Sequence, residues 1–344
     1  MDGPTYSIVI PIFNEEETLD ELLSRMLALM DRLDGSAEVI LVDDGSTDSS
    51  YDSLTTAAGR DPRFKVIQLS RNFGHQIAIT AGLDFSSGEA VAVMDADLQD
   101  PPEVILDMAA KWREGFEVVY AVRERREGEG AFKRTTARIF YRALRRLTDI
   151  EAPLDVGDFR LVDRKALEAF KGMRESNRYV RGMFSWIGFK QTGVRYTRAE
   201  RYAGTTKFSF RKMAKFALDG VVSFSDVPLR LALNLGFLLA ALSFVGGGLA
   251  LISKITGAYV VPGWASLVVV TAFLGGIQLI ILGVLGEYIG RIHDEVKNRP
   301  LYLVRDAHNF PLRVRSEPRR LIRPADPGPG GEVEIEEIYP TPPA

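Results

Sequence analysis

Two long stretches without a charged residue constrain this chain more than any other feature. The first runs from Leu231 to Ser253 and the second from Ile255 to Gly286. Each can cross the hydrocarbon core of a bilayer as a helix, which takes about 20 apolar residues. Two such stretches in succession are rare in soluble cores, so the sequence predicts a transmembrane hairpin of two helices over residues 230–290.

Basic residues flank the predicted hairpin on both sides. They are Arg211, Lys212, Lys215 and Arg230 before it, and Arg291, Lys297 and Arg299 after it. The positive-inside rule therefore places both flanks in the cytoplasm. The first residues, Met1 to Tyr6, carry no basic segment followed by an apolar one, so no signal peptide is expected. We expect the N-terminal part and both termini to be cytoplasmic.

The N-terminal part of the chain alternates short apolar runs with helical patterns. The runs expected to form strands are 6–11, 38–42, 65–69, 90–94 and 117–121, and the helical patterns cover 19–30, 76–85 and 102–113, with a further helix beginning near Ser49. Strands that alternate with helices in this way predict an α/β fold with a parallel, doubly wound sheet.

Polar clusters follow three of these predicted strands. They are Asn14-Glu15, Asp43-Asp44 and Asp95-Ala96-Asp97. Parallel strands bring their carboxyl ends to one edge of the sheet, where ligands bind in α/β folds, so three clusters there indicate a shared pocket. Asp95, Asp97 and Gln99 offer the hard oxygen ligands that Mg²⁺ or Mn²⁺ takes beside phosphates. For the Asp-x-Asp motif alone, a turn that caps the next helix is an equal alternative.

Several chemistries are disfavoured by what the sequence lacks. It has no cysteine, and its three histidines, His75, His293 and His308, are far apart, so thiol nucleophiles and a His-rich metal site are not expected. His75 is interpreted as a hydrogen-bonded structural residue. No glycine-rich dinucleotide fingerprint or P-loop follows the first strand. The net charge of -3 gives no reason to expect a nucleic acid partner.

Six motifs together resemble a known enzyme family. They are Pro11-Ile12-Phe13-Asn14-Glu15, Val42 to Asp48, Arg71 to His75, Asp95 to Glu103, Gly157 to Leu161 and Gly286 to Arg291. Over residues 6 to 304 the chain resembles the inverting GT-A glycosyltransferases of family 2. Within the dolichol-phosphate mannose synthase-like branch, it looks most like bacterial polyprenyl-phosphate (bactoprenol) glucosyltransferases.

The resemblance implies a cytoplasmic GT-A domain with a Rossmann-like, mostly parallel sheet. The protein itself would be anchored in the bacterial inner membrane. The implied reaction moves a hexose, glucose in the first place, from a UDP-sugar to undecaprenyl phosphate on the cytoplasmic face. GDP-mannose or a UDP-aminoarabinose derivative is the alternative donor. A processive polysaccharide synthase would need more spans, and a non-catalytic sugar-nucleotide-binding membrane protein is the remaining alternative.

The resemblance also implies roles for individual residues. The donor nucleotide would be held by Pro11, Asn14, Glu15, Asp43, Asp44 and Asp95, and the metal, Mg²⁺ or Mn²⁺, by Asp95, Asp97 and Gln99. The phosphate-binding residues would be Arg123, Arg134, Arg201 and Lys207, and the catalytic set Asp97, Asp158, Arg201 and Lys207. Guanidinium groups suit phosphate because their N–H groups fork onto its oxygens.

Two interpretations of Asp158 remain open. It is either a catalytic base or a positioning residue that orients the sugar or the acceptor or completes the metal shell. A lipid phosphate is largely ionised at neutral pH, since its second pKa is about 6, so it has little proton to lose.

The expected organisation has five parts. They are a catalytic domain over 1–205, an amphipathic membrane-interface helix over 206–229, the two spans over 230–290, a cytoplasmic juxtamembrane segment over 291–316 and a disordered tail over 317–344. A second interface helix is expected near 134–147, because a lipid acceptor requires a site at the bilayer surface. We also expect a homo-oligomer, since Gly246 to Gly248 permit close helix packing. By resemblance, a separate flippase and a downstream glycosyltransferase would handle the product.

Overall fold

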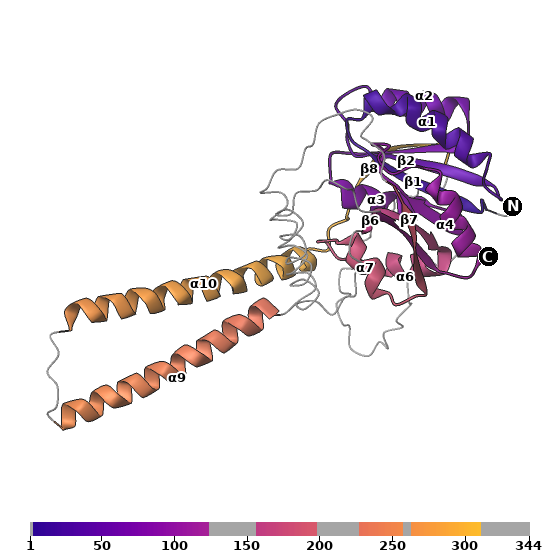
Figure 1. Cartoon of the computed structure of the whole chain (residues 1–344). Helices are drawn as coiled ribbons and strands as arrows, with labels where there is room; N and C mark the ends of the chain where they lie inside the picture. Colours follow the sequence, from indigo (N-terminus) through magenta and orange to yellow (C-terminus); the bar gives the residue numbers. More distant parts are fainter. Residues whose placement is uncertain (1–2, 124–155, 198–226, 257–262, 311–344) are drawn as a thin grey trace, which may run out of the picture. The chain divides into compact units, whose positions relative to one another are not determined.

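A computed structural model describes residues 3–123, 156–197, 227–256 and 263–310 (Figure 1). In chain order its elements are β1 (Tyr6–Ile12), α1 (Glu16–Met30), β2 (Ala37–Asp43), α2 (Ser50–Arg60), β3 (Phe64–Leu69), α3 (His75–Phe85), β4 (Ala90–Val93), α4 (Val104–Arg113), β5 (Val118–Arg123), β6 (Val156–Asp163), α6 (Arg164–Gly172), α7 (Val180–Trp186), β7 (Gln191–Tyr196), α9 (Val227–Ile255), α10 (Trp264–Val296) and β8 (Val304–His308). The alternation of strands and helices predicted for the N-terminal part is confirmed.

The strands form one 8-stranded sheet in the order β7-β5-β6-β4-β1-β2-β3-β8. Strand β1 pairs in parallel with β2 and β4, β2 with β3, and β5 with β7. Strand β6 lies antiparallel between β4 and β5, and β8 lies antiparallel against β3. The sheet is therefore mixed, with two antiparallel strands that sequence patterns missed. In β6, the buried Asp158 and Arg160 interrupt the apolar run that would have marked a strand.

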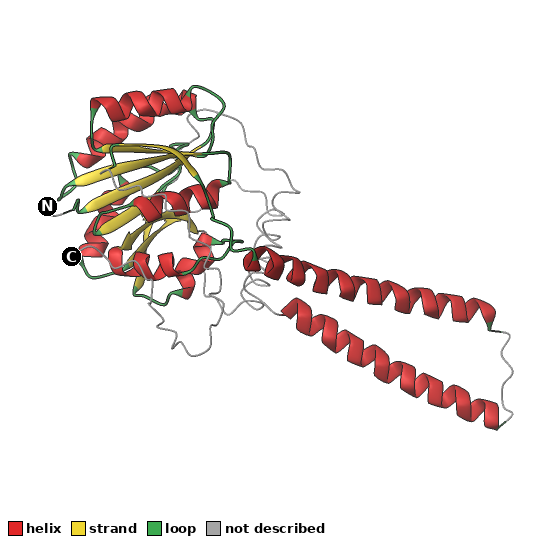
Figure 2. Cartoon of the chain, turned by 180° about the vertical axis from the view of Figure 1, so that it is seen from behind, coloured by secondary structure: helices red, strands yellow, loops and turns green. Residues whose placement is uncertain are grey.

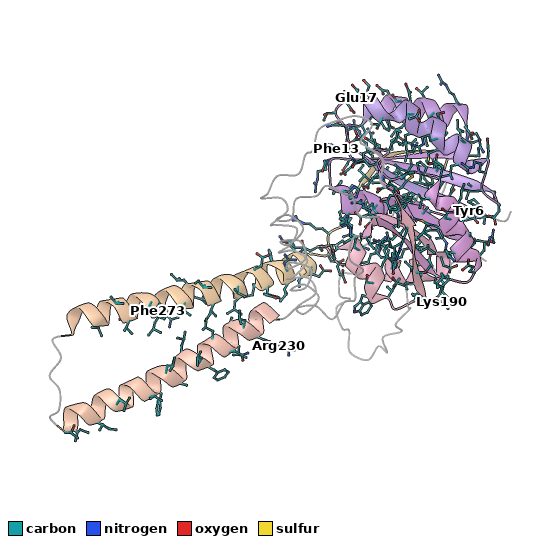
Figure 3. All side chains as sticks on the ribbon, in the orientation of Figure 1. Tyr6, Phe13, Glu17, Lys190, Arg230 and Phe273 are labelled. Atoms are coloured by element: carbon teal, nitrogen blue, oxygen red, sulfur yellow. The ribbon has the colours of Figure 1, made fainter. Side chains whose placement is uncertain are left out.

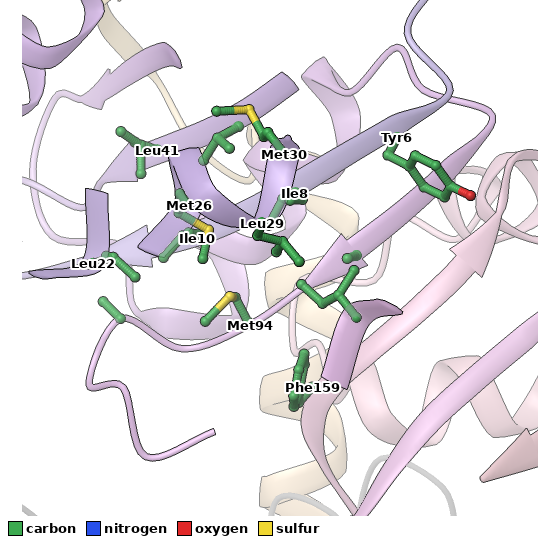
Figure 4. Close-up of a cluster of buried hydrophobic side chains, with 14 of the residues drawn as sticks. Tyr6, Ile8, Ile10, Leu22, Met26, Leu29, Met30, Leu41, Met94 and Phe159 are labelled. Carbon is green, nitrogen blue, oxygen red and sulfur yellow. The ribbon is translucent and has the colours of Figure 1, made fainter. Parts of the chain in front are cut away.

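Helices cover both faces of this sheet (Figure 2). On one face, Ile8 and Ile10 of β1 pack in a cluster that includes Leu22 and Met26 of α1 and Phe159 of β6 (Figure 4). Each such buried side chain contributes about 1.5–3 kcal/mol relative to an exposed one. Helix α3 packs against β1 and β2. The core thus fixes the strand ends, and with them the loops that carry the polar clusters.

Helices α9 and α10 have the composition of membrane spans. By length and hydropathy, Leu229–Gly246 and Val269–Val296 could each cross a bilayer, with mean hydropathies of 1.8 and 2.2. Large apolar side chains are exposed along both helices, and Phe273 on α10 is one of them (Figure 3). Helix α10 continues to Val296, beyond the end at residue 290 expected from the uncharged run.

The chain returns to the sheet after α10. Strand β8 pairs with β3 from Val66 opposite His308 to Leu69 opposite Val304. The Tyr51 hydroxyl is 3.0 Å from an oxygen of Asp306 and 3.0 Å from Nε2 of His308. Residues 304–308, expected to lie in a juxtamembrane segment, are therefore an edge strand. Their polar sequence gave no strand signal, because one face of an edge strand can stay wet.

Removing β8 is expected to destabilise the domain. A chain that ends at Pro300 loses the β3 ladder and the side-chain contacts of β8, so its Tm in detergent should fall by roughly 5–10 °C. A chain that ends at Phe310 keeps β8 and is the matched control. Differential scanning fluorimetry compares the two. Equal Tm values would show that β8 adds nothing to stability.

Candidate active site

The sheet opens where its strand order reverses. Strand β1 lies between β2 and β4, but β4 ends at Val93, which pairs with Val9, whereas β1 and β2 continue to Ile12 and Asp43. The Val9 carbonyl accepts from Met94, and the Ile12 carbonyl accepts from Asp44. Alternate residues of β1 therefore face opposite neighbours, and Pro11 faces the side where β4 has ended. Its missing N–H costs no ladder bond there, at the crevice where α/β sheets bind ligands.

The loops after β1 and β2 are bonded to each other. Asn14, with φ of 54°, donates its N–H to Ser46 Oγ at 3.0 Å, and its side-chain oxygen accepts from the Thr47 N–H at 2.8 Å. The N–H of Glu15 donates to Ser50 Oγ at 3.0 Å. Asn14 and Glu15, predicted to hold the donor nucleotide, thus also join the two loops into one rigid wall of the crevice.

The adjacent acids Asp43 and Asp44 are both buried but are used differently. Asp43 Oδ1 accepts from the Ser46 N–H at 3.1 Å, while its buried Oδ2 finds no hydrogen-bond donor in the described part of the chain. Asp44 accepts from the N–H groups of Phe73 at 2.7 Å and Gly74 at 2.9 Å. Burial raises the pKa of Asp44, with these two N–H groups opposing the rise. Asp44 therefore holds the loop that leads into α3 by two hydrogen bonds, and Asp43 Oδ2 remains available to accept a hydrogen bond from a ligand.

Asp95 and Asp97 lie on the loop that follows β4. Asp95 Oδ1 is buried and accepts no hydrogen bond within the described ranges, and His75 Nε2 lies 3.4 Å from it. Asp97 Oδ1 accepts from the Gln99 N–H at 3.1 Å, across a turn in which Leu98 has φ of 55°. Burial raises the pKa of Asp95; His75 lowers it, while nearby carboxylates add to the rise.

This environment fits a divalent cation. A bound cation would satisfy the orphaned Asp95 oxygen and offset the crowding of negative charge around it. Within the described ranges, no group of three or more histidine or acidic side chains is arranged to hold a metal ion. The residues present therefore fit a site of one or two carboxylates whose other ligands come from substrate phosphates and water, as is usual for Mg²⁺.

Asp158 on β6 is surrounded by donors. Arg181 on α7 forks onto it, with Nε 2.9 Å from Oδ1 and Nη2 3.1 Å from Oδ2. Gln76 Nε2 donates to Oδ2 at 3.1 Å, and His75 Nε2 lies 3.3 Å from the same oxygen. Burial alone would raise the pKa of Asp158, but the charge and hydrogen bonds of Arg181, together with His75, hold it well below its usual range.

Arg123 at the end of β5 belongs to a neighbouring network. The Tyr196 hydroxyl donates to the buried Asp100, Arg123 Nε donates to Tyr196 Oη at 3.1 Å, and Arg123 Nη2 lies 3.5 Å from Asp100. A Cβ on Gly157 would come within 2.9 Å of Nη2, so this glycine leaves room for the Arg123 guanidinium. The predicted phosphate-binding Arg123 is thus held next to the carboxylates.

The structure brings most predicted site residues to one sheet edge, but not all can be placed. The described residues do not include Arg134, Arg201, Lys207, the predicted interface helix near 134–147, residues 206–226 of the other predicted interface helix, or the tail over 317–344. Residues 227–229 of the interface helix predicted over 206–229 form the start of α9. The structure adds to the site Gln76, Asp100, Arg181 and Tyr196, for which the sequence predicted no role. It also brings in His75, which was interpreted as a hydrogen-bonded structural residue and lies 3.3 Å from Asp158. His75 and Asp100 lie within the motifs Arg71 to His75 and Asp95 to Glu103, whereas no sequence feature marked Gln76, Arg181 or Tyr196.

Comparisons with known proteins show the family of this chain. Residues 7–170 match the family described as Glycosyl transferase family 2. The chain is 50% identical over 318 residues to an uncharacterized glycosyltransferase, YkcC, of Bacillus subtilis, covering 92% of this chain and 97% of that protein. It is 41% identical over 302 residues to a prophage-derived bactoprenol glucosyl transferase of Shigella flexneri, an alignment that covers 88% of this chain and 98% of that protein. A solved glucosyl-3-phosphoglycerate synthase from Mycobacterium tuberculosis aligns at a TM-score of 0.45 and 17% identity, covering 64% of this chain and 78% of that one.

Proposed function

Because the chain belongs to glycosyl transferase family 2, we propose that it transfers glucose from UDP-glucose to a polyprenyl phosphate at the cytoplasmic face of a bacterial membrane. Proteins named bactoprenol glucosyl transferase are 40–41% identical over nearly their whole length, which supports this acceptor and this sugar. The observation that carries the proposal is the strand-end cluster of carboxylates on a domain whose sheet is completed after two membrane-type helices.

The return of the chain to the sheet supports the topology. Strand β8 follows α10 and pairs with β3, which precedes α9, so these two strands would lie on the same side of a membrane that both helices cross. An even number of crossings follows. We propose a two-helix hairpin with the catalytic domain cytoplasmic, where a soluble nucleotide sugar can meet a lipid acceptor. This domain would comprise residues 1–205 together with β8.

For the donor, we propose that Asp43 binds the nucleotide and that Asp95 and Asp97 hold Mg²⁺ or Mn²⁺. The unused Oδ2 of Asp43 can accept from a base N–H or a ribose hydroxyl. A divalent cation, when bound, would stabilise the negative charge of the departing nucleoside diphosphate. We propose that Arg123, whose Nη2 is 3.5 Å from Asp100, contacts phosphate, and Gln99, Arg134, Arg201 and Lys207 remain predicted ligands.

For the transfer step, we propose that Asp158 positions the reactants. Its depressed pKa makes it a poor base, and the donors of Arg181, Gln76 and His75 surround its carboxylate. The lipid phosphate oxygen attacks the anomeric carbon from the face opposite the diphosphate; the new C–O bond forms as the bond to the leaving group breaks, and the configuration inverts. No enzyme nucleophile is needed.

Membranes that contain the full-length protein test this proposal. Labelled UDP-glucose, GDP-mannose and a UDP-aminoarabinose derivative are each supplied with undecaprenyl phosphate, and label is counted in the organic extract. We expect transfer from UDP-glucose, with NMR of the product showing an anomeric configuration opposite to the donor's. Transfer from another donor alone would reassign the sugar. A polymeric product would indicate a processive synthase, and no transfer by the folded protein would indicate a non-catalytic binding protein.

A further inference from the structure

We propose that Arg181 is a positioning residue for this reaction, which holds the Asp158 carboxylate in one orientation beside the site of transfer. The inference rests on the proposed function and deepens it. Asp158 was assigned a role by resemblance, whereas Arg181 lies in a segment, Tyr179 to Trp186, to which sequence analysis gave no role. Arg181 acts through Asp158 and is not itself proposed to touch the substrate.

The geometry is that of a planar fork. Arg181 Nε and Nη2 each meet a different oxygen of Asp158, at 2.9 and 3.1 Å, which fixes the plane of the carboxylate as well as its position. The Asp158 side chain is 3% exposed and that of Arg181 is 31% exposed. The pair therefore lies at the boundary between the core and the crevice, with the carboxylate on the inner side.

Gln76 extends the fork into a three-element junction. Its Nε2 donates to Asp158 Oδ2, and its Oε1 accepts from the Val180 N–H at 3.1 Å. Helix α3, helix α7 and strand β6 therefore converge on one carboxylate. Asp44 accepts from the N–H groups of Phe73 and Gly74 just before α3, and Gln76 in its first turn donates to Asp158. The start of α3 therefore connects Asp158 to the loop on the proposed donor side of the site.

Stability alone explains this pair poorly. A buried ion pair seldom stabilises a fold more than apolar residues of the same volume would, because both charges must be desolvated. The pair lies beside residues with proposed substrate roles: His75 connects Asp158 to Asp95, and Gly157 leaves room for Arg123. Burying the Asp158 carboxylate beside these residues costs desolvation free energy. This placement is consistent with a reaction that requires the carboxylate in one fixed orientation.

Loss of Arg181 has a specific consequence for protonation. The charged groups that face Asp158 are Arg181, Arg160, His75 and Asp95, with the Tyr179 hydroxyl near the two arginines. Without Arg181, burial is the largest influence on Asp158 and raises its pKa. The carboxyl would then take up a proton as the pH falls, and its protonated oxygen would turn into a donor with a different orientation.

The test compares Arg181→Gln, Arg181→Lys and wild type in full-length protein, with transfer to undecaprenyl phosphate measured from pH 6 to 9. The ratio of variant to wild-type kcat is plotted against pH, so that titration of the acceptor phosphate cancels. For Arg181→Gln we expect a loss of roughly 10- to 100-fold at pH 7, recovering at least about tenfold toward pH 9 as Asp158 ionises. For Arg181→Lys, which keeps the charge but not the fork, we expect a lowered ratio that is flat with pH.

Two controls separate positioning from folding. Arg63→Gln breaks a similar fork, between Arg63 and Asp61 on the loop before β3, where Arg63 Nη2 is 2.8 Å from Asp61 Oδ2. It should leave the ratio near one. Asp158→Asn combined with Arg181→Gln should abolish the recovery at high pH. If Arg181→Gln shows a flat ratio, or only a lower Tm with wild-type kcat, the inference is wrong; an inactive wild type would instead contradict the proposed function.

Discussion

Asp95→Asn and Asp97→Asn are each expected to lower glycosyl transfer by at least about 10³-fold, because each removes a negative charge from the proposed metal site. Asparagine keeps the volume of the side chain, so the fold should persist. For Asp95 we further expect an unchanged or higher Tm in the absence of metal. In the wild type the buried Oδ1 of this half-buried side chain accepts no hydrogen bond in the described structure, and neutralising the carboxylate removes an unfavourable charge.

Metal titration followed by Tm gives an independent readout. Mn²⁺ or Mg²⁺ should raise the Tm of the wild type in the presence of UDP, and this increase should disappear in both variants. Asp52→Asn, on the exposed face of α2, is the matched control and should retain both transfer and the increase. A variant of Asp97 with full transfer would remove it from the metal site.

Asp43→Asn and Asp44→Asn are expected to separate binding from stability, although the two acids are adjacent. Asp44→Asn turns an N–H donor toward the backbone N–H of Phe73 or Gly74, so the free energy of unfolding should fall by about 2–3 kcal/mol and the Tm by roughly 4–10 °C. Asp43→Asn leaves Oδ1 able to accept from Ser46, so its Tm should change little. Its KM for the nucleotide sugar should rise about 10- to 100-fold.

Thermal unfolding and steady-state kinetics on the two variants check this division. Asp44→Asn should also lower kcat, because the loop that it latches leads directly to His75 and Gln76. The opposite pattern, in which Asp44→Asn changes only the donor KM and Asp43→Asn changes only the Tm, would exchange the roles assigned to the two carboxylates.

The sequence predicted those parts of the fold that depend on local pattern. Apolar runs followed by acidic loops located β1, β2 and β4, and the uncharged stretches located α9 and α10. Strands β6, β7 and β8 were missed because their positions depend on pairing: β6 carries two buried charges, and β7 and β8 are short edge strands with polar residues.

The candidate site was likewise predictable only where it depends on local sequence pattern and strand order. Residues at strand ends could be found, because topology alone brings them together. The partners of Asp158 could not, since Arg181 is on α7 and Gln76 on α3, and no spacing along the chain connects them to β6. The different uses of Asp43 and Asp44 depend on which backbone N–H groups come within reach, and only the folded loops determine that.

The position of β8 links the biogenesis of the protein to its activity. Strand β3 is synthesised well before its partner, and the partner emerges only after both apolar helices have left the ribosome. During that interval β3 presents an unpaired edge of the kind that recruits other chains. A chain cut short before β8 would keep this edge and be exposed to aggregation. The catalytic sheet can therefore be completed only after both apolar helices have been synthesised, because its last strand follows them in the chain.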